Sequence, residues 1–263
     1  MVPAPLADTH AHLADEQLRD QVEAIVEAAK LAGVERILTV GTDVSACEES
    51  IRIAERFPEV YAAVGIHPQE AAAFDEAGLA EIRRLAEHPK VVAIGEIGLD
   101  YYRDYAPVER QRAAFAAQLE LAADLSLPVV VHNRSADADV HRMIGEVIRP
   151  SSLAGRAGVL HCFGGSAAEA ALARQLGFYV SYAGNLTFKK TEELRTVAGR
   201  LPLEWLLVET DSPYLAPEPR RGRTNTPANV ALTAERLAAL HRVPLATVAG
   251  QTFANARALF GWT

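Results

Sequence analysis

The sequence is poor in cysteine and has no long hydrophobic run. Cys47 and Cys162 are the only two cysteines in 263 residues, which excludes a disulfide framework and fits a reducing compartment. No uninterrupted apolar stretch approaches the ~20 residues of a transmembrane helix. The first residues, MVPAPLADTHAHLADE, lack the basic and apolar regions of a secretory signal. We therefore expect a cytoplasmic protein that does not bind membranes.

Positive charge is also scarce. Lys and Arg number 26 against 34 Asp and Glu, which gives a formal net charge of -8. Such a chain is not expected to coat long nucleic acids non-specifically, because that binding needs many contacts from Lys and Arg to phosphates. A local polyanion site that relies on metal ions or a few arginines stays compatible with this charge.

No linker, low-complexity segment or shift in composition divides the chain, which predicts one domain over residues 1–263. Short β-rich apolar runs alternate instead with amphipathic stretches, and successive runs lie roughly 30 residues apart, as in strands with return helices. The expected strands are residues 6–10, 36–41, 60–65, 91–96, 128–132, 158–161, 178–181 and 205–209.

Helices are expected between and after these strands. The expected helices are residues 15–31, 45–57, 107–125, 166–176, 227–241 and 245–260. Gly33 follows the helix 15–31 and Gly177 follows the helix 166–176, at a position that glycine often occupies, and Ser166 is suited to begin the second of these helices. Eight strand–helix units predict an α/β fold, the (β/α)8 TIM barrel. An open doubly wound sheet is the alternative, but no glycine-rich dinucleotide turn follows the first strand.

Histidines and carboxylates gather at the carboxyl ends of the expected strands, the end of a barrel that carries chemistry. The side chains at these ends are His10, His12, His67, Glu96, His132, His161 and Asp211. The remaining histidines, His88, His141 and His241, lie in or near helices, where surface or packing roles are expected.

The spacing of these residues points to a metal site. His10 and His12 are two residues apart, which on an extended strand places both imidazoles on one face. With His132, His161, Glu96 and Asp211 they would supply imidazole and carboxylate ligands, a set that suits zinc, manganese, iron or cobalt.

Six ligands exceed the need of one zinc ion that keeps a water, so two ions that share a carboxylate are favoured. Glu96 is the better candidate for the shared carboxylate, because a position in the middle of the barrel can reach both sides.

The motifs at these positions resemble the TatD family of metal-dependent hydrolases, described as deoxyribonucleases within the amidohydrolase-like barrels. They span nearly the whole chain in order: DTHAHL at 8–13, GIHP at 65–68, IGEIGLDYY at 94–102, VHNR at 131–134, LHCFGG at 160–165, ETDSPYL at 209–215 and PEPRRGRTNTPANV at 217–230.

The resemblance implies two divalent ions, which would be Mg²⁺, Mn²⁺ or Zn²⁺. His10, His12 and Asp211 would bind the first ion, and His132 and His161 the second, with Glu96 as the bridge. Asp211 would also orient or deprotonate the attacking water. The implied reaction is hydrolysis of phosphodiester bonds in single-stranded DNA from the 3′ end.

The family pattern also suggests substrate contacts. His67 is expected to contact a substrate phosphate; its alternative role is to fix the loop before Pro68. Arg220, Arg221 and Arg223 form a short basic loop after the last strand, where guanidinium groups can bind phosphates. The alternative for these arginines is a solvated surface.

Other residues of the motifs are expected to support the site. Glu209 shares the strand face of Asp211 and would hold a metal ligand in place or form a buried salt bridge. Asp100 would support a ligand or a loop. Tyr101 and Tyr102 are interpreted as aromatic packing. Cys162 follows His161 directly, so its thiol is expected to face away and to pack.

Three residues depart from the family pattern. Ser135 stands where the family often has Asp, Thr226 where it often has Glu, and Arg220 where it often has His. None is a predicted metal ligand, so these departures bear on substrate preference. The loss of acidic residues near the opening would favour an anionic substrate.

A metal-dependent deoxyribonuclease is the leading interpretation, with DNA as substrate, no obligate protein partner and a monomer as the favoured state. The alternative is a two-metal hydrolase of another ester or amide, such as a mischarged-tRNA ester or a small lactone, because the same site would activate water for either. A non-catalytic barrel is disfavoured because every expected ligand is present.

Overall fold

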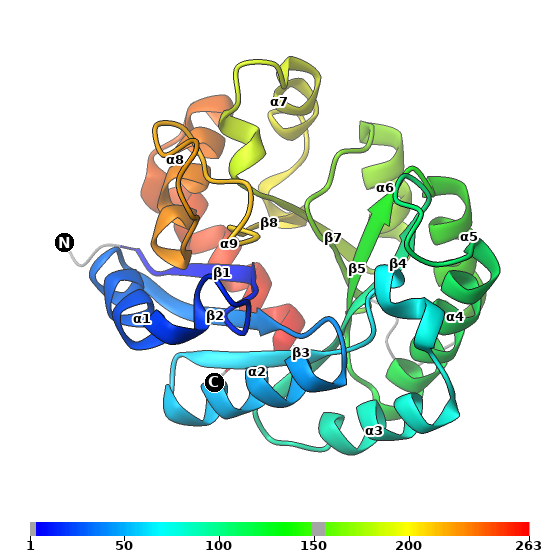
Figure 1. Cartoon of the computed structure of the whole chain (residues 1–263). Helices are drawn as coiled ribbons and strands as arrows, with labels where there is room; N and C mark the ends of the chain where they lie inside the picture. Colours follow the sequence, from blue (N-terminus) through cyan, green and yellow to red (C-terminus); the bar gives the residue numbers. More distant parts are fainter. Residues whose placement is uncertain (1–3, 149–155, 263) are drawn as a thin grey trace.

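Eight parallel strands form the centre of the molecule, with helices around them (Figure 1). The computed structural model describes residues 4–148 and 156–262. The strands are β1 (Leu6–Ala11), β2 (Val34–Val40), β3 (Val60–Val64), β4 (Val91–Asp100), β5 (Val129–Arg134), β6 (Gly158–Leu160), β7 (Phe178–Tyr182) and β8 (Leu206–Val208).

The sheet closes where the first and last strands meet. The strands pair in chain order from β1 to β8. The amide of Asp211 donates to the carbonyl of His10 at 2.9 Å, and the amide of His12 donates to the carbonyl of Ser212 at 2.7 Å. The predicted (β/α)8 TIM barrel is therefore confirmed.

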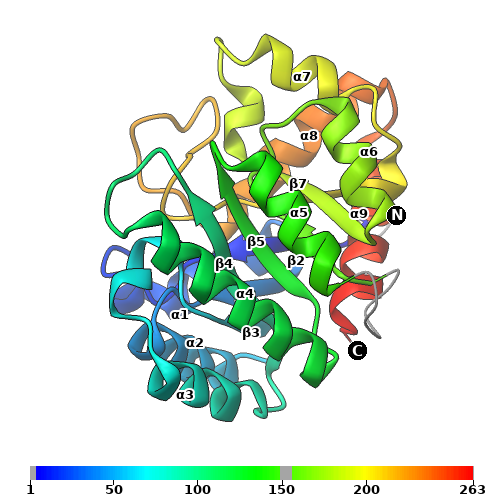
Figure 2. The same ribbon diagram turned by 90° about the vertical axis from the view of Figure 1, so that its right-hand side faces the viewer.

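Helices cover the outside of the barrel, and Figure 2 shows α4 and α5 in front of β4 and β5. The helices are α1 (Val22–Leu31), α2 (Val44–Arg56), α3 (Glu76–Ala86), α4 (Val108–Leu125), α5 (Asp137–Val147), α6 (Ala167–Gln175), α7 (Glu192–Ala198), α8 (Val230–His241) and α9 (Leu245–Phe260). None of these helices in the described chain is long and apolar enough to cross a membrane.

Local sequence signals explain several helix ends. Ser166 precedes α6, where its hydroxyl accepts from the amide of Glu169 and its own amide donates to the Glu169 carboxylate. Gly33 and Gly177 both have a φ of +85°, which allows the chain to turn after α1 and α6. The expected helix 15–31 is wrong at its beginning, because α1 begins at Val22. The Asp15 carboxylate accepts from the amide of Gln17 and favours a turn there.

The inside of the barrel is apolar at one end. Buried side chains from all eight strands form one cluster with Phe260 and Trp262 at the end of the chain. In Figure 1 α9 lies behind the barrel. The apolar packing closes this end, so the polar residues at the carboxyl ends of the strands face the open end.

Strand β4 is longer than the expected 91–96 and continues beside β5 to Asp100. Gly98 permits this close pairing. Its φ is +141°, and a Cβ atom there would lie 2.0 Å from the carbonyl oxygen of His132. Glu96 already lies within the expected strand, and the extension adds Asp100 next to β5, which carries His132.

Candidate metal centre

A cavity of about 750 Å³ opens at the carboxyl ends of the strands. Its lining includes six of the seven side chains expected at the strand ends, namely His12, His67, Glu96, His132, His161 and Asp211. The seventh, His10, is fully buried and lies within 4 Å of Glu96 and Asp211.

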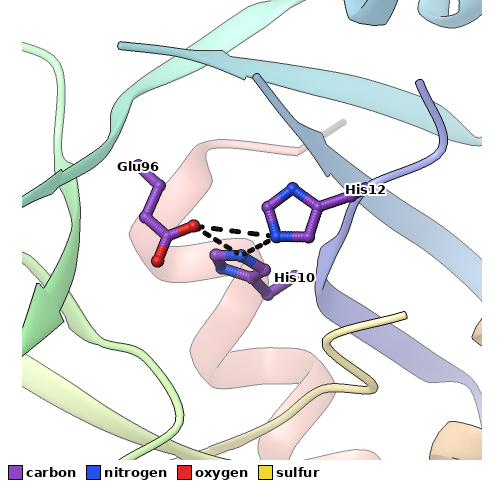
Figure 3. Close-up of side chains that lie close together, drawn as sticks. All are labelled: His10, His12 and Glu96. Atoms are coloured by element: carbon purple, nitrogen blue, oxygen red, sulfur yellow. Dashed lines mark hydrogen bonds and ion pairs between the residues drawn. The ribbon is translucent and has the colours of Figure 1, made fainter. Parts of the chain in front are cut away.

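Four of these side chains form a first group around one point. His10 Nε2 lies 3.2 Å from His12 Nε2 and 3.3 Å from Glu96 Oε2 (Figure 3). Asp211 Oδ1 lies 3.8 Å from His10 Nε2 and 3.5 Å from His12 Nε2. Ligand atoms about 2.1 Å from one ion lie roughly 3.0–3.5 Å apart, so three of these four distances fit a bound divalent cation and the His10–Asp211 distance is slightly longer.

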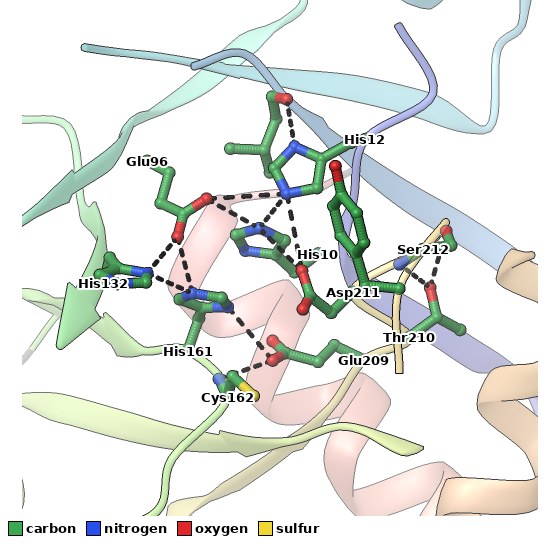
Figure 4. A network of polar contacts seen from close by, with 12 residues as sticks. His10, His12, Glu96, His132, His161, Cys162, Glu209, Thr210, Asp211 and Ser212 are labelled. Atoms are coloured by element: carbon green, nitrogen blue, oxygen red, sulfur yellow. Dashed lines mark hydrogen bonds and ion pairs between the residues drawn. The ribbon is translucent and has the colours of Figure 1, made fainter. Parts of the chain in front are cut away.

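The other oxygen of Glu96 belongs to a second group. Glu96 Oε1 lies 2.7 Å from His161 Nε2 and 2.9 Å from His132 Nδ1, and these two nitrogens are 3.5 Å apart (Figure 4). Each oxygen of the Glu96 carboxylate therefore faces its own pair of imidazoles. This is the arrangement expected of a carboxylate shared by two cations.

A buried carboxylate, Asp8, fixes the strand ends that carry the first group. Asp8 Oδ1 accepts from the amide of Thr210 at 2.8 Å, and Oδ2 accepts from the Thr210 hydroxyl at 2.5 Å. The same oxygen, Oδ1, lies 3.4 Å from the amide of His10. Asp8 thus connects β1, which carries His10, to the segment that carries Asp211.

One hydrogen bond and two contacts with carboxylates, all at the far nitrogens, orient three of the imidazoles. His12 Nδ1 lies 3.0 Å from the carbonyl oxygen of Val40, which can only accept, so the proton is on Nδ1. His132 Nε2 faces Asp100 Oδ2 at 3.3 Å, and His161 Nδ1 faces Glu209 Oε1 at 3.4 Å. Each contact leaves the other ring nitrogen with a free lone pair directed at the centre.

His10 differs from these three because, among the described residues, its Nδ1 is buried and has neither a hydrogen bond nor an ion-pair contact within 4 Å. A nitrogen of His10, a nitrogen of His161 and a carboxylate oxygen of Glu209 lie within 4.8 Å of one another. Glu209 is fully buried and also accepts from the amide of Cys162 at 2.6 Å. The Glu209 carboxylate therefore lies close to His10 of the first group and to His161 of the second.

Burial and neighbouring charges shift the pKa values of several side chains of the centre away from their usual values. Burial raises the pKa of Glu96, but the nearby charges of His161, His67 and His10 outweigh it and hold that pKa well below the usual value. Burial lowers the pKa of His10. For His161, burial is outweighed by Glu96 and Glu209, so its pKa is raised. Protons on such imidazoles compete with cations, and cation binding is expected to weaken as the pH falls.

His67 lies beside the second group, with its Nε2 3.5 Å from Glu96 Oε1. Its Nδ1 accepts from the amide of Gln69 at 3.1 Å, so the proton of the neutral ring is on Nε2. Burial lowers the pKa of His67, which favours that neutral form. His67 therefore presents an N–H donor to the cavity, which suits a phosphate oxygen.

The basic loop lies outside this cavity. Arg220, Arg221 and Arg223 are exposed and are not among the residues that line it, and the guanidinium of Arg221 lies 3.8 Å from the ring centre of Phe188. Arg103 and Arg134 line the cavity instead. The sequence signal for Arg134 was its place at the end of VHNR, two residues after a predicted strand end.

Two packing predictions are wrong. Cys162 has a φ of +44°, which redirects the chain after His161, and its side chain lines the cavity. Tyr102 is 68% exposed, because it lies in the turn after β4 rather than in the core. Ser135, Thr226 and Arg220, where the chain departs from the family pattern, do not line the cavity.

Comparisons with known proteins agree with this geometry. A family model described as TatD related DNase matches residues 7–261. The "Uncharacterized metal-dependent hydrolase YabD" of Bacillus subtilis is 40% identical over 97% of this chain and 98% of that protein. The "3'-5' ssDNA/RNA exonuclease TatD" of Erwinia amylovora is 35% identical over 97% of this chain and 99% of its own length.

Comparison with solved structures finds a protein of the same family. The crystal structure of YJJV, a TatD homologue from Escherichia coli, superposes with a TM-score of 0.91 at 32% identity, over 98% of both chains. The family match covers nearly the whole chain, and the ligand groups lie at its motifs. The chain therefore belongs to the family of TatD-related DNases, which are metal-dependent hydrolases.

Proposed function

We propose that this protein is a divalent-metal-dependent deoxyribonuclease that removes nucleotides from the 3′ end of single-stranded DNA. The observation that carries the proposal is the Glu96 carboxylate, whose two oxygens each face a separate group of imidazoles. The similarity to the 3'-5' ssDNA/RNA exonuclease of Erwinia amylovora supports a single-stranded nucleic acid as substrate and the 3′ to 5′ polarity. The protein would act as a single-domain monomer in the cytoplasm.

Two ions, Mg²⁺, Mn²⁺ or Zn²⁺, would occupy the centre. His10, His12 and Asp211 would hold the first, His132 and His161 the second, with Glu96 between them. When bound, the ions would make water a nucleophile near neutral pH and offset charge on the phosphoryl oxygens. Asp100 and Glu209 would keep His132 and His161 in orientation.

Asp211 is the carboxylate best placed to act on water. Its side chain is 14% exposed and lines the cavity, whereas that of Glu96 is 4% exposed. Asp211 would accept the proton of the attacking water and hold that water in line with the phosphate. His67 would donate a hydrogen bond from Nε2–H to a phosphate oxygen. The three arginines of the basic loop would contact the DNA strand farther from the bond that is cut.

Turnover of labelled single strands by metal-stripped protein tests this proposal. Refilling with Mg²⁺, Mn²⁺ or Zn²⁺ should restore cleavage that is absent in the stripped protein. A strand labelled at its 5′ end should give a ladder of shortened products, and one labelled at its 3′ end should release a labelled mononucleotide first. Single-stranded RNA of the same sequence, run in parallel, measures the preference for DNA.

Intact DNA with all three metals, after metal loading has been verified by elemental analysis, would contradict the nuclease proposal. A panel of mischarged-tRNA esters, lactones and amides would then identify the bond that the centre hydrolyses.

A further inference from the structure

Two positively charged side chains line the cavity of the candidate metal centre and belong to neither ligand group. Arg103 and Arg134 are the only Lys or Arg side chains among the described residues that line it. Both are exposed, and in the part of the chain that the structure describes neither forms an ion pair with a carboxylate. Their charge is therefore available to a phosphate in a cavity that otherwise carries the carboxylates of Asp15, Glu70, Glu96 and Asp211.

Two exposed tyrosines, which are not among the residues that line the cavity, contact these arginines. Tyr102 is 68% exposed and Tyr105 is 59% exposed. The guanidinium of Arg134 lies 4.3 Å from the ring centre of Tyr102, and that of Arg103 lies 5.9 Å from the ring centre of Tyr105. Arg134 covers one face of the Tyr102 ring, and the large exposed fraction leaves the other face open. An open aromatic face beside cations is typical of proteins that bind single strands by base stacking.

The turn that carries Tyr102 and Arg103 is fixed to the metal centre. Asp100 Oδ1 accepts from the amides of Tyr102 and Arg103 at 3.0 and 2.9 Å. Its other oxygen, Oδ2, lies 3.3 Å from His132 Nε2. Asp100 is 1% exposed, so one buried carboxylate holds both a metal ligand and the turn. The arginine and the tyrosine are thereby held at a defined position relative to the reacting phosphate.

We propose that Tyr102, Arg103 and Arg134 form a subsite for the nucleotide next to the bond that is cut. Tyr102 stacks on the base of that nucleotide, and the two guanidinium groups bind the phosphates on either side. The inference rests on the proposed nuclease function and adds the residues that grip the strand. Because neighbouring base pairs cover both faces of a base inside a duplex, this subsite selects single strands over duplexes.

Replacement of Tyr102 by alanine tests the stacking. Tyr102→Ala should raise KM for a single-stranded oligonucleotide about tenfold and change kcat less than twofold, since one base–aromatic stack is lost. Tyr102→Phe keeps the ring and should behave as the unaltered protein. An oligonucleotide without a base at the contacted position should be cleaved equally well by Tyr102→Ala and by the unaltered protein.

The arginines are tested by charge removal. Arg103→Ala and Arg134→Ala should each raise KM about fivefold to tenfold and reduce the dependence of KM on salt, because each removes a phosphate contact. Arg83→Ala is the matched control, since Arg83 is exposed on α3 and does not line the cavity. Bis(p-nitrophenyl) phosphate, which lacks a neighbouring nucleotide, should be hydrolysed equally by all these variants.

Binding of a fluorescent phosphorothioate strand, followed by anisotropy, measures the subsite without turnover. Unchanged affinity and KM in Tyr102→Ala and Arg134→Ala would overturn the subsite and leave the nuclease proposal intact. An equal loss of activity on bis(p-nitrophenyl) phosphate would also overturn it, because the residues would then support the fold or the metal centre. Failure of the unaltered protein to cleave any strand would instead refute the nuclease function.

Discussion

Replacing Glu96 with glutamine is expected to lower kcat for single-stranded DNA by about 10³-fold or more. Both oxygens of Glu96 face imidazole nitrogens, at 3.3 Å on one side and 2.7 Å on the other. An amide of the same shape keeps one oxygen but presents an NH₂ group, which cannot bind a cation, to the other group. The loss of one cation removes several kcal/mol of transition-state stabilisation.

The measurement is kcat at saturating metal, together with metal content and thermal stability. Glu96→Gln should fold and should hold fewer than two ions per chain. Glu70→Gln is the matched control, because Glu70 lines the same cavity but belongs to neither ligand group. If Glu96→Gln retained more than a tenth of the activity with both ions bound, a shared carboxylate would be ruled out.

Replacing Asp211 with asparagine is expected to lower kcat by about 10²-fold to 10³-fold. Asp211 contacts only the first group, through His10 and His12 at 3.8 and 3.5 Å. The variant should therefore lose affinity for the first ion and keep the second. Excess metal should restore occupancy but not the full rate, because asparagine cannot accept the proton of the attacking water.

Metal titration followed by calorimetry, in parallel with kinetics, checks this asymmetry. Asp15→Asn serves as the control, since Asp15 also lines the cavity and its carboxylate accepts from the amide of Gln17 in a turn. Loss of both ions from Asp211→Asn, or full recovery of the rate with excess metal, would contradict the separate role given to Asp211.

Residues near strand ends were the most predictable part of the molecule. Strand endings follow from short apolar runs, and a closed barrel brings all such endings to one edge, so the amino-acid sequence alone assigns His10, Glu96 and His161 to one site. The α9 helix could be predicted to the residue, because Pro244 precedes it and Gly261 follows it.

Contacts between distant segments could not be predicted from local patterns. The bond from Asp8 to Thr210 joins residues 202 positions apart. The partner of His12 Nδ1 is a backbone carbonyl, that of Val40, which has no sequence signal. The cavity position of Cys162 depends on a positive φ that most side chains disfavour.

The position of the arginines that line the cavity could not be predicted from local patterns either. Arg220, Arg221 and Arg223 attract attention as a cluster, yet a loop can carry its charges away from the barrel opening. Arg103 is a single cation in a turn, and its position depends on the hydrogen bonds that the amides of Tyr102 and Arg103 donate to Asp100. The turn is defined by Asp100, whose side chain also contacts His132, a proposed metal ligand.

Anomalous X-ray diffraction from crystals loaded with Mn²⁺ or Zn²⁺ tests most directly whether Glu96 joins two metal ions. Two peaks are expected, one on each side of the Glu96 carboxylate. The first should lie among His10, His12 and Asp211, and the second beside His132 and His161. A single peak, or two peaks that do not both contact Glu96, would contradict a two-metal centre with a shared carboxylate.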